Sequence, residues 1–230
     1  LPHEDLWQYP DGKVRAFGAA ELHRVCRMLE VELPPDVLTL RDGKKVAGIV
    51  LDMTGEEILL EKDTRTHTVD RTDVSEMEGP RIAYPEYVER LQKVYHAGFD
   101  DPAKAAELAE WCREKGLLRD VDIHYWRALQ LDPSFEPAHE ALGHQEASGM
   151  WGIRVRGHGV VDWRDLQEIR MDHADGWEFT TMHFTVTAGG SLLDALNVCS
   201  SLEILYHAYY SMFQEFVGFH EVQVPIKIAV

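Results

Sequence analysis

Apolar positions change their spacing along this chain, and each change marks a new kind of element. From Val37 to Met77 they fall in short runs separated by polar turns such as Asp42-Gly43, which predicts four or five short strands. So small a sheet buries its apolar face best by curling, and we therefore expect a small β-barrel over residues 37–78. Before it, within an N-terminal segment 1–36, only residues 19–30 show the spacing of a short amphipathic helix.

Helical spacing takes over after residues 79–85, which are predicted to be a linker because Gly and Pro bound them. Pro102 suits the first turn of a helix, Gly116 suits its end, and Asp120 is placed to cap the next helix. The helices predicted for this part of the chain, residues 86–150, span about 87–95, 102–115, 121–131 and 136–143.

The last part, residues 151–230, is predicted to hold a short helix after Asp162 and then a strand, a long helix and a second strand. The strands are expected over 177–188 and 222–230, with the helix between Ser191 and Gly218. The predicted apolar stripe of that helix consists of Leu192, Leu196, Cys199, Leu202, Leu205, Tyr209, Phe213 and Phe216. This order predicts a βαβ unit with parallel strands.

A two-stranded parallel unit is not stable alone, so we expect either that the parent polypeptide continues beyond Val230 or that another chain completes the sheet in an oligomer. The predicted fold class is therefore α+β. It combines a small SH3-like barrel, a helical segment and a C-terminal βαβ unit that belongs to an incomplete domain.

The charge of the chain limits the kinds of partner that it is expected to bind. The formal net charge is −17, and each of the three parts carries more acidic than basic residues. Nucleic-acid binding needs a basic surface, and anionic membranes also attract basic segments, so neither partner is expected. No apolar run is long enough to span a bilayer, and no signal peptide is recognisable.

Candidate chemistry is sparse. Cys26, Cys112 and Cys199 lie far apart and without a CxxC pair, which favours three buried thiols, although one disulfide plus a free thiol also fits. His139 and His144 are five residues apart, and on a continuous helix their rings would point about 140° away from each other. The pair is therefore not predicted to bind a metal, and the sequence assigns no catalytic, cofactor-binding or metal-ligating residue.

Three other features have ordinary structural explanations that we favour. Ser191 follows Gly189-Gly190, where backbone N–H groups could hold an anion, but its expected role is to cap the long helix with Asp194. The carboxylate pairs Asp162/Asp165 and Asp172/Asp175 are expected at solvated helix ends rather than in acid–base catalysis.

Two segments resemble known families. Residues 37–78, with the Asp42-Gly43 turn and a long strand that contains Gly48, resemble SH3-like and Sm-like barrels. Sm-like barrels often bind RNA, but this stretch has 6 basic and 10 acidic residues. Leu108-Ala109 and Leu142-Gly143 repeat at a distance of 34 residues, which resembles a tetratricopeptide repeat, although Val121 stands where a small Ala is usual.

A broader resemblance covers residues 105–230. This part of the chain resembles the region that precedes the zinc motif in large exported bacterial proteins with a gluzincin-like peptidase domain of unknown function. The resemblance lies in the helical stretch followed by Met150-Trp151-Gly152, in "TTMHFTVTAGGSLLDALNVCSSLEILYHAYYSMF" and in "VPIKIAV". The resemblance implies an extracytoplasmic bacterial location and carries no catalytic residue onto this chain.

Three functional hypotheses follow. The first is a non-catalytic interaction or scaffold region that binds a protein partner or the remainder of its parent polypeptide. The second is part of a zinc peptidase-like enzyme whose catalytic motif lies outside these residues. The third, and the weakest because of the acidic charge, is Sm-like RNA binding.

Overall fold

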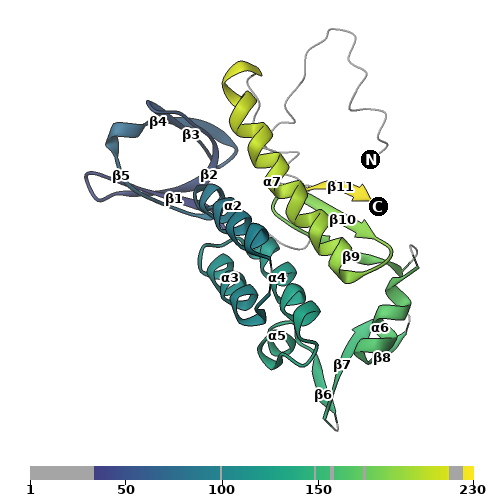
Figure 1. Cartoon of the computed structure of the whole chain (residues 1–230). Helices are drawn as coiled ribbons and strands as arrows, with labels where there is room; N and C mark the ends of the chain where they lie inside the picture. The colour runs from purple at the N-terminus through teal and green to yellow at the C-terminus, as the bar shows by residue number, and fades with distance from the viewer. Residues whose placement is uncertain (1–33, 99, 148, 156–157, 173–174, 218–224) are drawn as a thin grey trace.

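The computed structural model describes residues 34–230 except 99, 148, 156–157, 173–174 and 218–224, and it is a mixed α+β structure (Figure 1). The described residues form six α-helices and three β-sheets. The helix predicted over residues 19–30 lies outside them. Within the described residues, no helix combines the length and the apolar character needed to cross a membrane.

The first sheet contains five antiparallel strands in the order β4-β3-β2-β1-β5. They are β1 (Asp36–Leu40), β2 (Lys45–Met53), β3 (Glu57–Lys62), β4 (Arg65–Asp70) and β5 (Val74–Glu78), with the 3-10 turn η2 (Arg71–Asp73) before the last. The sheet is not closed into a barrel, because no described strand pairing joins β4 to β5. The expected closed barrel is therefore wrong, and the sheet instead curls around a small core of Leu38, Val50, Ile58, Leu60 and Val74.

Strand β2 pairs with β1 on one side and with β3 on the other, and Gly48 lies where the pairing changes. The first half of β2 pairs with β1 and the second half with β3. A Cβ atom at Gly48 would lie 2.4 Å from the carbonyl oxygen of Glu61, on β3. Only glycine allows the two strands to approach so closely.

The predicted linker over residues 79–85 is instead the beginning of helix α2 (Pro80–Ala97). Pro80 occupies the first helical position, where its missing N–H is not needed. The buried carboxylate of Asp36 accepts hydrogen bonds from the backbone N–H groups of Arg81 and Val50 and forms an ion pair of 3.2 Å with the Arg81 guanidinium. This carboxylate thus attaches the start of α2 to the first sheet.

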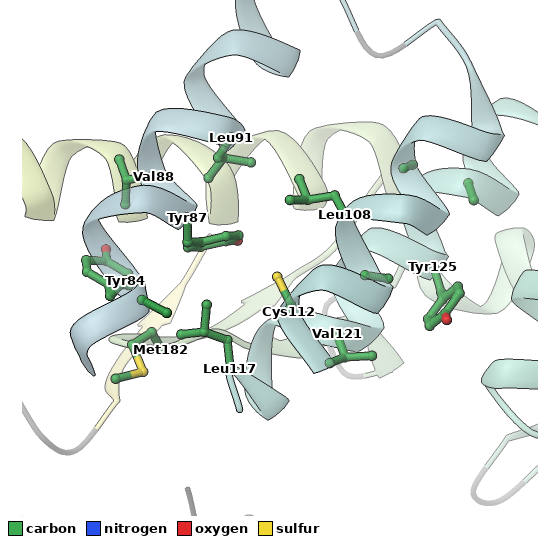
Figure 2. Close-up of a cluster of buried hydrophobic side chains, with 14 of the residues drawn as sticks. Tyr84, Tyr87, Val88, Leu91, Leu108, Cys112, Leu117, Val121, Tyr125 and Met182 are labelled. Atoms are coloured by element: carbon green, nitrogen blue, oxygen red, sulfur yellow. The ribbon is translucent and has the colours of Figure 1, made fainter. Parts of the chain in front are cut away.

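The helical segment continues with α3 (Pro102–Glu114), α4 (Leu118–Leu131) and α5 (Glu136–Ala141). Asp101 caps α3 by accepting from the N–H of Ala103, and Gly116 follows the helix with a φ of +78°, as the sequence predicted. Figure 2 shows the core that these helices share, in which Tyr87 and Leu91 of α2 face Leu108 and Cys112 of α3. The wide apolar contact fixes α2 against α3 and α4.

A three-stranded antiparallel sheet that the sequence analysis did not predict follows α5. Its strands are β6 (Gln145–Ala147), β7 (Met150–Val155) and β8 (Gly159–Val161). Two of them are only three residues long, and glycines interrupt their apolar alternation. Helix α6 (Trp163–Arg170) comes next, with Asp162 as its cap.

The single strand predicted over residues 177–188 is two strands, β9 (Trp177–Thr180) and β10 (Phe184–Ala188), which form a tight antiparallel hairpin. The alternation of side chains runs unbroken through the turn between them, so the pattern alone could not reveal it. Helix α7 (Leu192–Val217) leads to β11 (Ile226–Ala229), which pairs in parallel with β10. The predicted parallel strands joined by the long helix are thus confirmed.

Helix α7 is buried along its first half only. Leu192, Leu196 and Cys199 pack on the sheet of β9 to β11. Leu205 and Tyr209, predicted for the same buried stripe, are 64% and 50% exposed. The stripe fails there because α7 extends beyond the sheet that covers its first turns (Figure 1). The side chains of Phe213 and Phe216 are outside the described part of the chain.

Candidate functional site

A groove with a volume of about 860 Å³ lies on the helical segment. Helices α3 and α5 form its walls, with one residue each from α2 and α4. It lies where α3 and the start of α5 stand beside each other against α4, because Ala105, Ala109 and Ala138 are fully buried and keep the helices close. Small residues at the helix contacts therefore position the groove.

Aromatic side chains form the apolar floor of the groove. Trp111 of α3 and Phe135, just before α5, are half-buried, and Tyr125 of α4 lies beneath them with 2% of its surface exposed. The guanidinium of Arg90 lies 4.6 Å from the centre of the Trp111 ring, a cation–π contact. The floor is thus already suited to a flat cation.

Four exposed glutamates line the groove: Glu107, Glu110 and Glu114 on α3, and Glu140 on α5. The three on α3 share one face because they are three, four or seven residues apart. The hydroxyl of Tyr125 donates to the Glu110 carboxylate, and Arg113 donates to it at 2.6 Å. The hydrogen bond from Tyr125, together with Arg113, lowers the pKa of Glu110 below its ordinary value, so this carboxylate is ionised at neutral pH.

The other three glutamates form no ion pair or hydrogen bond with the described residues, which leaves their charges available to a ligand. An apolar floor with a negative edge suits a ligand that presents an apolar side chain beside a cation. The sequence analysis missed this site. The available signal was the spacing of Glu107, Glu110, Trp111 and Glu114 on one helical face.

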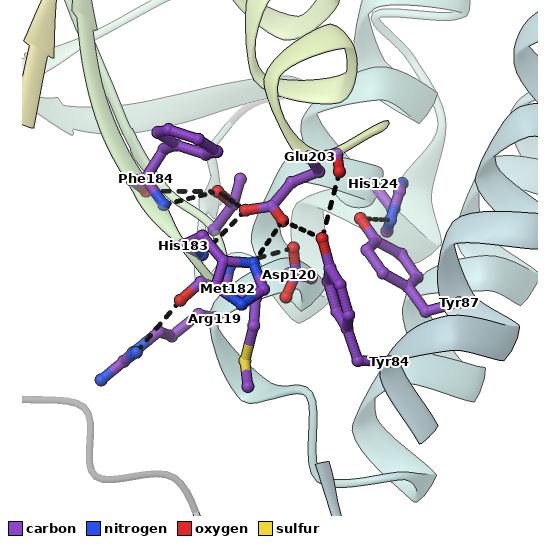
Figure 3. Close-up of polar contacts among 10 residues, drawn as sticks. Tyr84, Tyr87, Arg119, Asp120, His124, Met182, His183, Phe184 and Glu203 are labelled. Carbon is purple, nitrogen blue, oxygen red and sulfur yellow. Dashed lines mark hydrogen bonds and ion pairs between the residues drawn. The ribbon is translucent and has the colours of Figure 1, made fainter. Parts of the chain in front are cut away.

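A second polar cluster lies inside the molecule, around Glu203 of α7 (Figure 3). Its carboxylate accepts from the hydroxyls of Tyr84 and Thr181, each at 2.5 Å, and from the backbone N–H and Nδ1 of His183, each at 2.8 Å. These bonds tie α7 to α2 and hold the turn between β9 and β10. They are the physical reason why the chain turns at Thr181 instead of continuing as one strand.

The electrostatics of this cluster depend on a second buried acid, Asp120. Burial and the nearby Glu203 raise the pKa of Asp120 well above its ordinary value. Burial also acts to raise the pKa of Glu203, but the charge and hydrogen bonds of His183 outweigh it and hold that pKa below the ordinary value. The surroundings therefore favour the ionised form of Glu203 and the protonated form of Asp120.

The predicted capping of α4 by Asp120 is wrong. Asp120 lies inside the first turn of the helix and points into the core. Its Oδ1 accepts from the N–H of Met182 at 3.4 Å, and its Oδ2 has no hydrogen-bond partner among the described residues. Asp120, His183 and Glu203 are each fully buried. The cluster therefore has no open face for a substrate, and its role is to join the elements.

His139 and His144 meet, contrary to the sequence prediction that their rings point apart. That prediction assumed a continuous helix, but α5 ends at Ala141 and Gly143 has a φ of +70°. The chain turns back, and the Nδ1 atoms of the two rings lie 2.8 Å apart. Within the described residues, no three His, Cys, Asp or Glu side chains group closely enough to bind a metal ion together.

The remaining candidates have structural roles. Ser191 caps α7, accepting from the N–H of Asp194 at 3.1 Å and donating to its carboxylate at 2.6 Å. Asp162 accepts from the N–H of Asp165 at the start of α6, as expected for a helix end. Cys112 and Cys199 are buried free thiols, and burial raises the pKa of Cys199 to about 12. Cys26 is outside the described residues.

Comparison of the sequence with protein-family models gave no match, and a search of curated proteins gave none either.

Proposed function

We propose that this chain is a non-catalytic protein-interaction region whose groove binds an extended peptide segment of a partner. The segment carries Lys or Arg beside an aromatic or aliphatic side chain. The observation that carries the proposal is the apolar floor of Trp111, Tyr125 and Phe135 beside four exposed glutamates. Such a surface gains free energy from burying an apolar side chain and gains specificity from the complementary charge.

The proposal also takes the helical segment to be tetratricopeptide-like. Its support is that α3 begins at Pro102 and α5 at Glu136, which is the 34-residue distance of that repeat. The buried alanines Ala105, Ala109, Ala128 and Ala138 support it too, because the repeat needs small residues where helices cross.

We likewise propose that the first sheet is an open relative of the SH3-like barrels. The strand order β5-β1-β2-β3-β4, the close approach of β2 to β3 at Gly48 and the 3-10 turn before β5 support this. The acidic composition of residues 37–78 argues against RNA as its ligand. A zinc peptidase would require catalytic residues from outside this chain.

The proposed function is tested by peptide binding. Ten-residue fluorescent peptides that alternate Arg or Lys with Phe or Leu are titrated with the full chain, and peptides with Glu in place of the cations serve as the comparison. The variant Glu107→Gln/Glu114→Gln should weaken binding of the basic peptides about tenfold, since each exposed charge pair contributes up to about 1 kcal/mol.

The matched control is Glu57→Gln/Glu76→Gln, which removes two exposed charges from the first sheet. It should change the dissociation constant less than about twofold. Equal binding of acidic and basic peptides, or equal affinity of the two double variants, would contradict the proposal. A weakening of binding with added salt is expected, because the charges are exposed.

A further inference from the structure

The meeting of His139 and His144 has a defined hydrogen-bond pattern. The Nε2 of His139 lies 2.8 Å from the carbonyl oxygen of Pro133. A carbonyl can only accept, so this ring carries its proton on Nε2 and leaves a lone pair on Nδ1. The Nδ1 of His144, 2.8 Å away, must then donate to it.

Both rings are held in place by indoles. The His139 ring stacks on Trp151 with centroids 4.6 Å apart and planes 4° apart, and the His144 ring meets Trp126 edge-on at 5.3 Å. A hydrogen bond from the outer ring nitrogen to a backbone carbonyl, as His139 makes to Pro133, is the usual way in which proteins orient a metal-binding imidazole.

The hydrogen-bond pattern also makes the His139 ring neutral, because its Nε2 donates while its Nδ1 accepts. Neutral imidazole is the form that binds a metal. His139 is fully buried, whereas His144 is half-buried and gives the pair its access to solvent.

We propose that His139 and His144 form a two-nitrogen site for a late first-row divalent cation such as Ni²⁺ or Zn²⁺. With metal–nitrogen bonds of about 2.0–2.1 Å, two ligand nitrogens lie roughly 2.9 Å apart at a right angle and roughly 3.4 Å apart at a tetrahedral angle. The distance of 2.8 Å between the Nδ1 atoms is close to the right-angle value, and binding also requires the rings to turn until both lone pairs point at the cation instead of at each other. Imidazole ligands favour these cations over Mg²⁺ and Ca²⁺.

Binding requires one proton to move and none to be lost. The cation takes the lone pair that Nδ1 of His139 already presents. His144 gives up the proton on Nδ1 and takes one from solvent on Nε2, so its ring stays neutral while its Nδ1 binds the cation. The described side chains supply no third ligand, so water or a partner's side chain fills the remaining positions.

The test is a titration of the full chain with NiCl₂ and, separately, ZnCl₂. Calorimetry gives the stoichiometry and affinity, and quenching of tryptophan fluorescence by Ni²⁺ reports a cation near Trp126 and Trp151. One equivalent is expected to bind with accompanying quenching. His144→Ala should weaken this binding at least about tenfold, whereas the exposed-site control His67→Ala should leave it within about twofold.

The variant His144→Gln separates metal binding from folding. Its amide can still donate to Nδ1 of His139, so the native hydrogen bond is retained while the imidazole ligand is lost. Loss of binding in a His144→Gln chain with an unchanged unfolding midpoint supports the site. Unchanged affinity in that variant, or no binding to the unaltered chain at 1 mM cation, on the order of the weakest specific affinities, would overturn it.

Discussion

Individual buried carboxyl groups connect the elements of this molecule, and their partners set their pKa values. Asp120 and Glu203 are both fully buried, yet their pKa values shift in opposite directions because their partners differ. Glu203 has four donors, whereas Oδ2 of Asp120 has no hydrogen-bond partner among the described residues. Burial raises the pKa of both acids, but the charge of His183 and the donors around Glu203 outweigh it there. Sequence spacing showed Asp120 only as a helix cap, because burial depends on residues far away in the chain.

The raised pKa of Asp120 predicts a dependence of stability on pH. Its folded pKa is raised, so the folded state binds a proton that the unfolded state releases above about pH 3.9. The contribution of Asp120 to the free energy of unfolding is therefore fully present below that pH and falls as the pH rises towards the folded pKa. Asp120→Asn removes this dependence.

Urea unfolding at pH 5 to 8 measures the effect. The free energy of unfolding of Asp120→Asn should increase relative to the unaltered chain by up to about 1.4 kcal/mol per pH unit over the range in which Asp120 titrates. Asp73→Asn, on the exposed turn η2, is the control and should run parallel to the unaltered chain. Parallel curves for Asp120→Asn would show that Asp120 is ionised in the folded state.

At the scale of elements, local patterns predicted most helices well. Pro102, Gly116 and Ser191 mark ends that the structure confirms, because capping depends on neighbours in the chain. The errors occur where a distant contact decides the outcome. The start of α2 is fixed by Asp36, and the turn between β9 and β10 is fixed by Glu203, and neither contact is visible in local spacing.

The close approach of β2 and β3 gives a prediction for one element. Gly48→Ala should lower the free energy of unfolding by at least about 2 kcal/mol, because its Cβ would lie 2.4 Å from a backbone oxygen of β3 and the strands must separate. Urea unfolding measures it. At Gly55 no atom lies within 4 Å of an added Cβ, so Gly55→Ala should change stability by less than about 0.5 kcal/mol. Equal effects at the two sites would refute the argument.

At the scale of the whole molecule, the α+β class and the parallel return of β11 to β10 could be predicted from sequence, but the packing of the parts could not. The groove depends on how α3 and α5 lie against α4, and the pairing of His139 with His144 depends on where α5 ends. Both depend on distances between residues in the folded chain, which the spacing of residues along the sequence does not predict. The acidic excess, in contrast, is visible in the sequence and is consistent with the basic ligand proposed for the groove.

The hydrogen bonds of Glu203 predict how the parts unfold together. Glu203→Gln should cost about 3 kcal/mol, because an amide cannot replace the charge beside His183. Hydrogen exchange should then show a joint loss of protection in α2, α7 and β10, with the first sheet affected less. Glu168→Gln, exposed on α6, is the control and should leave the exchange pattern unchanged. Loss of protection confined to α7 would mean that Glu203 does not couple these elements.

Arg90 gives the groove an internal competitor. Its guanidinium lies over Trp111 and also forms an ion pair of 2.7 Å with Glu86, so the free molecule already holds a cation where a partner's arginine would stack. An incoming arginine must displace it, which costs affinity for single cations and favours ligands that engage several glutamates at once. If the groove binds a peptide as proposed, Arg90 would thus favour peptides that carry several cations over those that carry one.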